Sequence, residues 1–258
     1  MSMSFGEVVY PSSRAFWTEE DDENDNQSTE NLTKLFTVEW SEDIPQQINT
    51  LIVIETSLIV DFMKDYVSKN AKEVCQIKSS SSKHPSKLYK ASNNSFICLV
   101  SPDVELAQAG DFVDTASEIL KKAKNIIAIT SSHITQLKNI ENRNISTYLI
   151  SLYTRKATND VKNSISMPKQ PSIVPGVGAG VVAYAEVMDQ SASLNILYLD
   201  GYELDSNSAS PLTKLFAEVT KHELPELKCG KPFIFNKGNL YMYSNIFYYQ
   251  HRHINMAT

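Results

Sequence analysis

The stretch DFVDTASEILKKAKNIIAIT, residues 111–130, joins a helical pattern to a buried-strand pattern and indicates the fold class. Asp111 can cap the helix, and lysines near its end complement the carbonyl dipole. The second part, NIIAIT (125–130), is continuously apolar, as a strand covered on both faces should be. The apolar residues at helical spacing in the first part are Phe112, Val113, Ala116, Ile119, Leu120 and Ala123.

The same two patterns recur along the chain. The other continuously apolar runs are TLIVIE (50–55), SFICLV (95–100) and NILYLD (195–200), and the other helical patterns cover 58–67, 181–190 and 210–222. In the last pattern, Ser210 is expected to cap the helix and Pro211 to open it. This alternation predicts an α/β fold, a three-layer α/β/α sandwich with a mostly parallel central sheet. The serine-rich stretch 78–87 is expected to be an exposed loop or hairpin connection.

An acidic block separates the N-terminus from the rest of the chain. Residues 18–30 contain seven acidic side chains and no basic one, so the remainder carries a net charge near +1. Such a block cannot bury enough apolar surface to order itself. We therefore predict a flexible N-terminal segment over 1–35 and a single α/β domain with a C-terminal tail over 36–258. The apolar cluster FGEVVYPSSRAFW (5–17) either packs back onto the domain or binds a partner as a linear motif.

Composition excludes several classes of protein. No apolar run is long enough to span a membrane and the start lacks a secretory signal, so we expect the cytosol or the nucleus and no membrane partner. The nearly neutral domain has no basic stripe, which argues against nucleic-acid binding. Three cysteines without a C-x-x-C pair suit reduced thiols, with Cys98 a small core residue.

The glycine-rich stretch QPSIVPGVGAGVVAYAEV (170–187) invites comparison with phosphate-binding loops. Gly176, Gly178 and Gly180 are each two residues apart, which matches neither the dinucleotide fingerprint nor the Walker loop. We therefore expect no nucleotide cofactor here. The stretch instead predicts a loop whose glycines allow positive φ, followed by a helix that begins near Val181.

Ligands of open α/β sheets bind at the carboxyl ends of the strands, and the polar residues expected there are few. They are Glu55, Thr56, Ser101, Pro102, Asp103, Thr130, Ser131, Ser132, His133, Asp200 and Gly201. Loop hydrogen bonding is the preferred role for Ser131, Ser132 and His133, whereas Asp200 fits an acid, a base, a ribose ligand or a turn residue. His251 and His253 lack further ligands for a metal site. We accordingly predict no catalytic residue, cofactor or metal, and a binding protein.

An enzyme is the alternative. A nucleoside-phosphorylase-like or hydrolase enzyme would place a small molecule among Asp200, His133 and the 175–180 loop.

Five stretches, in this order along the chain, resemble the proteasome assembly chaperone family. They are FGEVVYPSSRAFWTEEDDE (5–23), ITSSHIT (129–135), QPSIVPGVGAGVVAYAEV (170–187), LNILYLD (194–200) and YSNIF (243–247). The resemblance implies an α/β/α sandwich and a non-catalytic cytoplasmic factor. Such a factor forms a heterodimer with proteasome assembly chaperone 2, binds proteasome α subunits and promotes assembly of the 20S α-ring.

The resemblance also implies where partners bind. The N-terminal candidates are Phe5, Gly6, Glu7, Val8 and Val9, and the C-terminal candidates are Ile246, Phe247 and Tyr248. Family members dock a C-terminal hydrophobic-Tyr-any-residue tail between α subunits. This sequence departs from that pattern, because it continues for eleven residues past Phe247 and ends Met256-Ala257-Thr258.

Overall fold

The computed structural model describes residues 35–80, 82–91, 94–137, 147–158, 173–201, 203–205, 207–220 and 233–234. All eight predicted partner-binding residues lie outside these ranges, as do His251, His253 and all but one residue of the predicted flexible segment 1–35. Within the described part, no helix is both long and apolar enough to cross a membrane.

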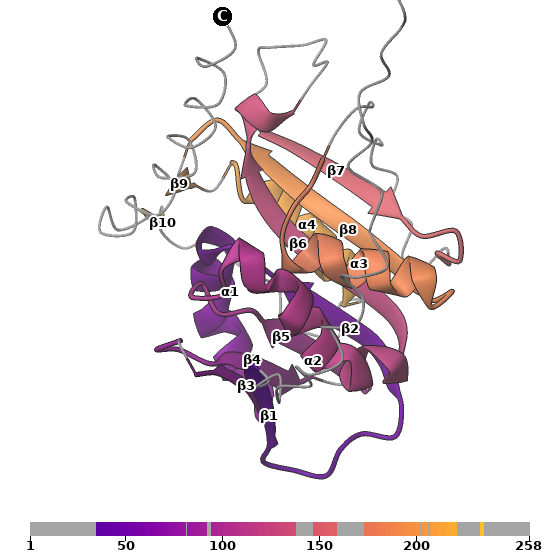
Figure 1. Ribbon diagram of the computed structural model, residues 1–258. Helices are drawn as coiled ribbons and strands as arrows, with labels where there is room; N and C mark the ends of the chain where they lie inside the picture. Colours follow the sequence, from indigo (N-terminus) through magenta and orange to yellow (C-terminus); the bar gives the residue numbers. More distant parts are fainter. Residues whose placement is uncertain are drawn as a thin grey trace, which may run out of the picture. The chain divides into compact units, whose positions relative to one another are not determined.

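An eight-stranded sheet forms the centre of the domain (Figure 1). Its spatial order is β1-β3-β4-β5-β2-β6-β8-β7. The strands are β1 Phe36–Trp40, β2 Ile48–Ile54, β3 Lys72–Ser79, β4 Ser86–Lys90, β5 Ser95–Leu99, β6 Ala123–His133, β7 Thr147–Tyr153 and β8 Ser191–Leu199. Two short strands, β9 Glu203–Leu204 and β10 Phe233–Ile234, pair separately.

The sheet is mixed, and the prediction of a mostly parallel sheet is wrong. The neighbours β5–β2, β2–β6 and β6–β8 are parallel. The neighbours β1–β3, β3–β4, β4–β5 and β7–β8 are antiparallel. The four continuously apolar runs of the sequence became the four central parallel strands. The antiparallel strands flank them and were not anticipated, because their sequences are less continuously apolar.

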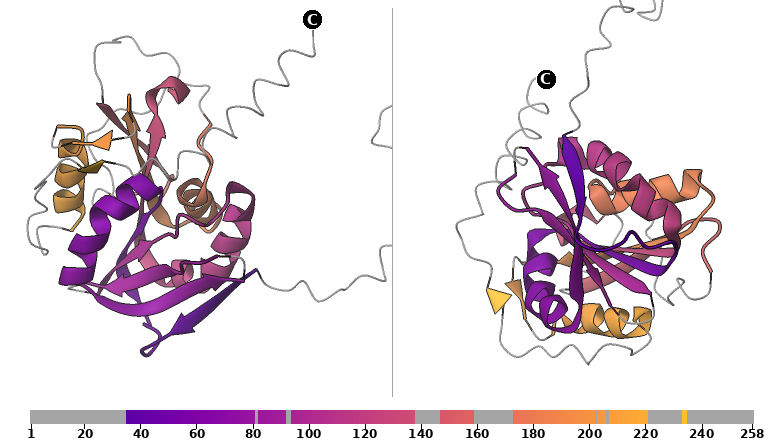
Figure 2. Two further views of the ribbon diagram at one scale, coloured as in Figure 1. Left: turned by 90° about the vertical axis from the view of Figure 1, so that its left-hand side faces the viewer. Right: turned by 90° about the horizontal axis from the view of Figure 1, so that it is seen from below.

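Helices lie on both faces of this sheet (Figure 2). They are α1 Ser57–Asn70, α2 Ala109–Lys122, α3 Val177–Val187 and α4 Ser210–Val219. The side chains of β6 and β8 alternate between the two cores: Ile126 and Leu194 pack with α2 and α3, whereas Ile127 and Leu197 pack with α1 and α4. This double coverage explains why each of the four central strands contains a continuous apolar run.

Helix boundaries depart from expectation by a few residues. Gln108 precedes the first helical residue of α2, so Asp111 lies in the first turn and favours the helix dipole there instead of capping it. Ala123 opens β6 and does not belong to the helix. Helix α3 begins at Val177, four residues before the expected Val181. Pro211 lies in the first turn of α4, with Ala209 as the cap residue and Ser210 inside the helix.

The serine-rich stretch connects β3 to β4 as a hairpin, which confirms the hairpin reading. Asp103, in the loop after β5, anchors it. Its Oδ2 accepts hydrogen bonds from the Ser82 hydroxyl at 3.2 Å, the Lys83 amide at 3.1 Å and the His84 amide at 3.0 Å. These contacts give Asp103 a structural role at a strand end where a ligand was considered.

Cys75 and Cys98 are buried free thiols, and burial raises the pKa of each to about 12. Because the thiolate is the reactive species, neither should react with iodoacetamide in the folded protein at neutral pH. We expect both to be alkylated fully in denaturant, with mass spectrometry of the separate peptides as the readout. Alkylation of either peptide in native buffer at the rate seen in denaturant would contradict this expectation.

Candidate functional site at the carboxyl ends of the parallel strands

The carboxyl ends of β2 and β6 lie beside the start of α3. Glu55 and Thr56 follow β2, Thr130 and Ser131 lie near the end of β6, and Gly176 precedes α3. The structure therefore brings together three predicted groups: the end of strand 50–55, the TSSH segment and the glycine-rich loop.

Glu55 supplies the anion at the N-terminus of α3. The Val177 amide donates to Glu55 Oε1 at 2.7 Å, and the Gly178 amide donates to Oε2 at 2.8 Å. The Thr130 side chain also hydrogen bonds this carboxylate. A helix N-terminus attracts anions because its amides lack partners within the helix and its dipole is positive there. The chain's own carboxylate thus occupies the position that a ligand phosphate would take.

The glycines leave room for this carboxylate. Gly176 has φ 109°, and a Cβ on it would lie 2.4 Å from Glu55 Oε1. A Cβ on Gly178 would lie 3.1 Å from Glu55 Oε2. The expected positive φ is confirmed at Gly176, where the close approach of Glu55 adds a second reason for glycine.

Glu55 carries the main electrostatic perturbation of this site. Burial raises the pKa of Glu55 above its ordinary value, and the hydrogen bonds from Gly178, Val177 and Thr130 offset only part of that effect. A buried carboxyl with a raised pKa can serve as a general acid or base. Here both oxygens accept hydrogen bonds from α3, so the arrangement favours a structural role that ties β2 to α3.

The TSSH segment forms local hydrogen bonds, as predicted. Ser131 Oγ lies 2.7 Å from Thr56 Oγ1, and Ser132 Oγ donates to Gln136 Oε1 at 2.6 Å. His133 caps the 3-10 turn Ile134–Gln136, where its Nδ1 accepts from the Thr135 amide at 3.3 Å. Thr56 itself has φ 71°, which is unusual for a β-branched residue.

His133 and Asp200 are neighbours at the ends of β6 and β8. The ring nitrogen Nε2 of His133 lies 3.2 Å from the main-chain oxygen of Asp200. A carboxylate that orients a catalytic histidine must bind the ring through its side chain. Within the described ranges, no group of three or more His, Cys, Asp or Glu side chains is placed to hold a metal ion.

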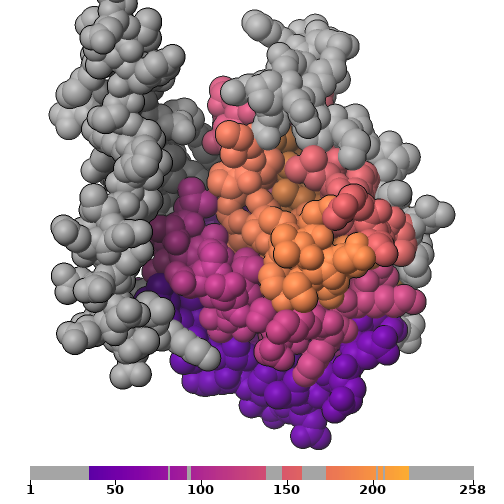
Figure 3. Space-filling model, turned by 45° about the vertical axis from the view of Figure 1, so that its right-hand side comes forward, coloured from indigo at the N-terminus to yellow at the C-terminus, as the bar shows by residue number. Residues whose placement is uncertain are grey.

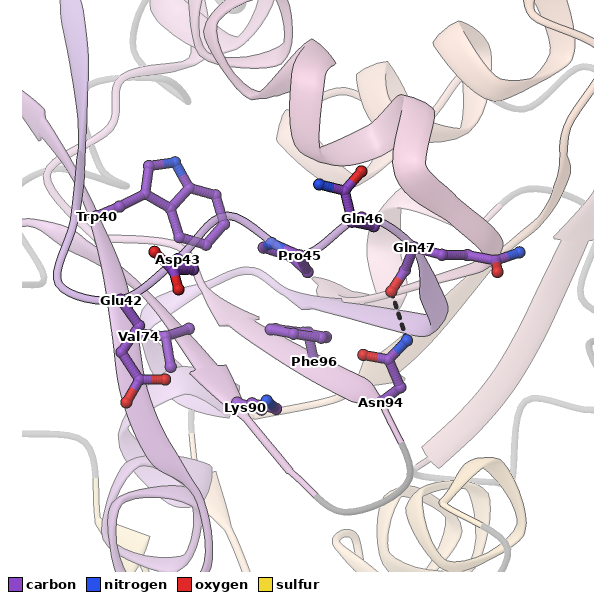
Figure 4. Close-up of a pocket in the computed structure, with 10 residues that line it drawn as sticks. All are labelled: Trp40, Glu42, Asp43, Pro45, Gln46, Gln47, Val74, Lys90, Asn94 and Phe96. Atoms are coloured by element: carbon purple, nitrogen blue, oxygen red, sulfur yellow. Dashed lines mark hydrogen bonds between the residues drawn. The ribbon is translucent and has the colours of Figure 1, made fainter.

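A cavity of about 280 Å³ opens beside the amino ends of β2 and β5, away from the carboxyl ends described above (Figure 4). Trp40, Val74 and Phe96 form apolar walls, and Asp43 and Asn94 lie at its edge. Sequence reasoning missed this cavity, because its walls come from β1, β3 and β5 and from the loop after β1. The role of Glu55 at the start of α3 was also missed. Its single sequence signal is an acidic residue directly after an apolar run.

Apolar side chains are also exposed beside and at the end of α3. Ile173 is 90% exposed and Val187 is 83% exposed, and Met188 follows them at 45%. The orange segment that contains α3 reaches the surface in Figure 3. Val187 and Met188 are adjacent at the end of α3, whereas Ile173 lies four residues before its start. Adjacent exposed apolar side chains are typical of protein-binding surfaces.

No protein-family model and no curated protein matches the sequence. Solved structures do share the fold. Pyrococcus furiosus PbaB, an archaeal proteasome activator, is 10% identical with a TM-score of 0.56, over 86% of this chain and 99% of PbaB. Pyrococcus furiosus PbaA, an archaeal homolog of proteasome-assembly chaperone, is 11% identical with a TM-score of 0.53, over 85% of this chain and 92% of PbaA.

A protein of unknown function from Thermoplasma acidophilum is 12% identical with a TM-score of 0.54, over 71% of this chain and 80% of that one. At these identities the similarity is one of fold. The α/β fold of this chain is therefore the fold of proteins that include an archaeal homolog of proteasome-assembly chaperone.

Proposed function

We propose that this chain is a non-catalytic chaperone of proteasome assembly, the counterpart of proteasome assembly chaperone 1. In this role it forms a heterodimer with proteasome assembly chaperone 2 in the cytosol or nucleus, binds proteasome α subunits and promotes assembly of the 20S α-ring. The observation that carries the proposal is the fold shared with PbaA and PbaB over most of each chain. The five stretches that resemble the family, in the same order, add independent support.

The occupied helix terminus supports a non-catalytic role. The glycine-rich loop is the feature of the sequence closest to a nucleotide site, and Glu55 fills the place of the phosphate. His133 contacts the main-chain oxygen of Asp200 and caps the turn that follows β6. The alternative enzyme would need these groups to converge on a substrate, and their hydrogen bonds instead join parts of the fold.

The mechanism we propose is selective binding. A chaperone shifts assembly toward one arrangement of subunits when it binds that arrangement more tightly than the others. The exposed apolar side chains of Val187 and Met188, adjacent at the end of α3, provide a surface on which another polypeptide can bury area. The apolar N-terminal cluster at 5–17 provides a second contact, joined to the domain by the acidic stretch 18–30.

Deletion of residues 1–17 should weaken binding to α subunits at least tenfold, because the deleted stretch holds the candidate contacts Phe5 to Val9. The domain should keep its circular dichroism spectrum and its unfolding midpoint. Binding is measured by surface plasmon resonance against purified α subunits. A second variant, with Phe5, Val8 and Val9 replaced by serine, removes the apolar side chains of the same stretch but keeps the length of the segment. Unchanged affinity in both variants would remove the N-terminus from the binding site.

Affinity purification of the tagged chain from its own cells tests the proposal as a whole. We expect proteasome assembly chaperone 2 and α subunits as companions, without mature β subunits. Loss of the chain should also reduce the yield of complete α-rings on native gels. A solitary chain with no proteasome subunit bound, in cells that assemble proteasomes at a normal rate, would overturn the proposal.

A further inference from the structure

We propose that strand β7 pairs with the β7 of a second copy of this chain, so that two sheets join edge to edge around a two-fold axis at Ile150. β7 forms one edge of the eight-stranded sheet, and β8 is its neighbour among the described strands (Figure 1). An edge strand exposes a row of backbone N–H and C=O groups that can pair with another strand. This inference goes beyond the proposed function, because it concerns the chain in the absence of any other protein.

The sequence of β7 lacks the features that protect an edge strand. Its seven residues, TYLISLY, include no charged side chain and no proline, and the strand follows β8 in one register without a bulge. Charges, prolines and bulges hinder edge-to-edge pairing in natural proteins. The opposite edge strand, β1, is shorter and contains Glu39, whose carboxylate pairs with Lys78 of β3. Of the two edges, β7 is therefore the one suited to pairing.

The register with β8 shows which backbone groups of β7 point outward. The Thr154 amide donates to the Ala192 carbonyl at 3.0 Å, so these two residues form a hydrogen-bonded pair. Hydrogen-bonded and non-hydrogen-bonded pairs alternate along an antiparallel ladder. The even-numbered residues of β7 therefore bond to β8, and the N–H and C=O groups of Leu149 and Ser151 point away from the sheet. No described residue bonds to these outward groups.

A two-fold axis at Ile150 gives these groups partners in a second copy. In an antiparallel pair centred there, Leu149 of one copy lies opposite Ser151 of the other, and the two residues exchange both hydrogen bonds. A shift by one residue would set outward-pointing groups against inward-pointing ones, so that register is excluded. Centring the pair on Leu149 or on Ser151 would leave one end of each strand without a partner. The axis at Ile150 uses the whole strand.

The side chains of β7 also suit a second copy. Ile150 belongs to the core on the α2 and α3 side, and Tyr148 and Leu152 pack against the same core and are half-buried. In the proposed pair, Ile150 lies opposite its own copy, and Tyr148 lies opposite Leu152. Aromatic–aliphatic pairs across neighbouring strands stabilise a sheet, whereas like charges directly opposite each other destabilise it. Self-pairing of β7 brings no charges together.

The charges beyond the end of β7 are compensated within the chain. Arg155 pairs with Glu186 at 2.6 Å, and Lys156 pairs with Asp189 at 3.0 Å. A partner strand that carried charges would therefore lose hydration at this edge without gaining an opposite charge. An uncharged strand of the same pattern complements the edge, and a second copy supplies one. A contact of seven residues a side is small, so we expect a weak and reversible dimer.

Sedimentation velocity of the full chain from about 1 to 200 µM measures the association. We expect a reversible dimer with a Kd of order 10 µM. Leu149→Pro removes an outward N–H without removing a bond to β8, and it should raise the Kd at least tenfold. The matched control Leu149→Ala loses similar packing but keeps the N–H, and it should change the Kd less than threefold. A monomer at every concentration, or equal dimerisation of the two variants, would overturn the proposal.

Cysteine cross-linking tests the register, in a chain that carries Cys229→Ser. Ile150→Cys would place two thiols in a non-hydrogen-bonded pair with Cα atoms about 4.5 Å apart, which a disulfide can bridge. The matched control Leu152→Cys would place them four residues apart along the strands, roughly 14 Å, which is too far. Mild oxidation should yield a covalent dimer from the first variant only. No cross-link with Ile150→Cys, or equal cross-linking of both variants, would contradict the pairing.

Hydrogen exchange distinguishes a second copy from a cover provided by the chain itself. The Leu149 and Ser151 amides should exchange more slowly as the protein concentration rises through the Kd. Protection that does not depend on concentration would assign this edge to another segment of the same chain and overturn the proposal. All three experiments use the chain alone, so their results are separate from those that test the proposed function.

Discussion

Gly176→Ala should lower the free energy of unfolding by about 3 to 5 kcal/mol, from two causes that act together. The backbone at φ 109° and ψ −179° lies in a region open essentially to glycine, at a cost of about 1 to 3 kcal/mol for another residue. The new Cβ would lie 2.4 Å from Glu55 Oε1 and displace the carboxylate from α3. Each hydrogen bond to a charged group that is lost costs a further ~1.5 to 3 kcal/mol. Urea unfolding followed by circular dichroism measures the loss.

Gly110→Ala is the matched control for this prediction. Gly110 lies in the first turn of α2, and a Cβ there would meet nothing within 4 Å. Alanine at such a helical position should leave stability unchanged or raise it by up to ~1 kcal/mol. If both alanine variants unfold at the same urea concentration, the contact between Gly176 and Glu55 has no energetic importance.

Glu55→Ala should lower the free energy of unfolding by about 2 to 4 kcal/mol, because the Val177 and Gly178 amides lose their acceptors in a buried site. Glu55→Gln should cost less, about 1 to 2 kcal/mol at neutral pH, since the amide oxygen can still accept one of the two hydrogen bonds. The same urea experiment measures both variants. An alanine variant as stable as the native protein would show that water or other groups replace the carboxylate fully.

The pH dependence separates the charge of Glu55 from its shape. Folding raises the pKa of Glu55 above 4.5, so the folded protein holds this proton more tightly than the unfolded chain does. The stability that the carboxyl contributes is therefore complete below pH 4.5 and is lost as the pH rises through the folded pKa. The difference in unfolding free energy between the native protein and Glu55→Gln should shrink over this window and stay constant above it. A difference that grows with pH would mean that the folded site favours the ionised form.

The buried carboxylate also bears on the proposed function. A phosphate ligand would have to compete with Glu55 for the same two amides, at a site already negative when the carboxyl is ionised. The fold shared with PbaA and PbaB can therefore hold a glycine-rich helix start without any nucleotide. In the proposed function, partner binding depends on exposed surfaces such as the apolar side chains at the end of α3.

Local sequence was sufficient for the centre of the sheet. The runs 50–55, 95–100, 125–130 and 195–200 became β2, β5, β6 and β8, and helical spacing located α1, α2 and α4 within a few residues. These elements are covered on both faces or pack along one apolar stripe, so burial leaves a strong periodic signal. The flanking strands leave a weaker signal. In β1, with the sequence FTVEW, more buried positions alternate with more exposed ones. A search for continuous apolar runs therefore does not detect this strand.

The sequence by itself determined the α/β class, the four central strands and the absence of a standard phosphate-binding motif, because each follows from residues close together in the chain. Only the tertiary structure decided the mixed order of the sheet, the cavity beside Trp40 and the partner of the glycine-rich loop. Glu55 and Val177 are 122 residues apart, and nothing in the spacing of either segment specifies the other. Their contact exists because parallel pairing brings the ends of β2 and β6 to the same edge of the sheet as the start of α3.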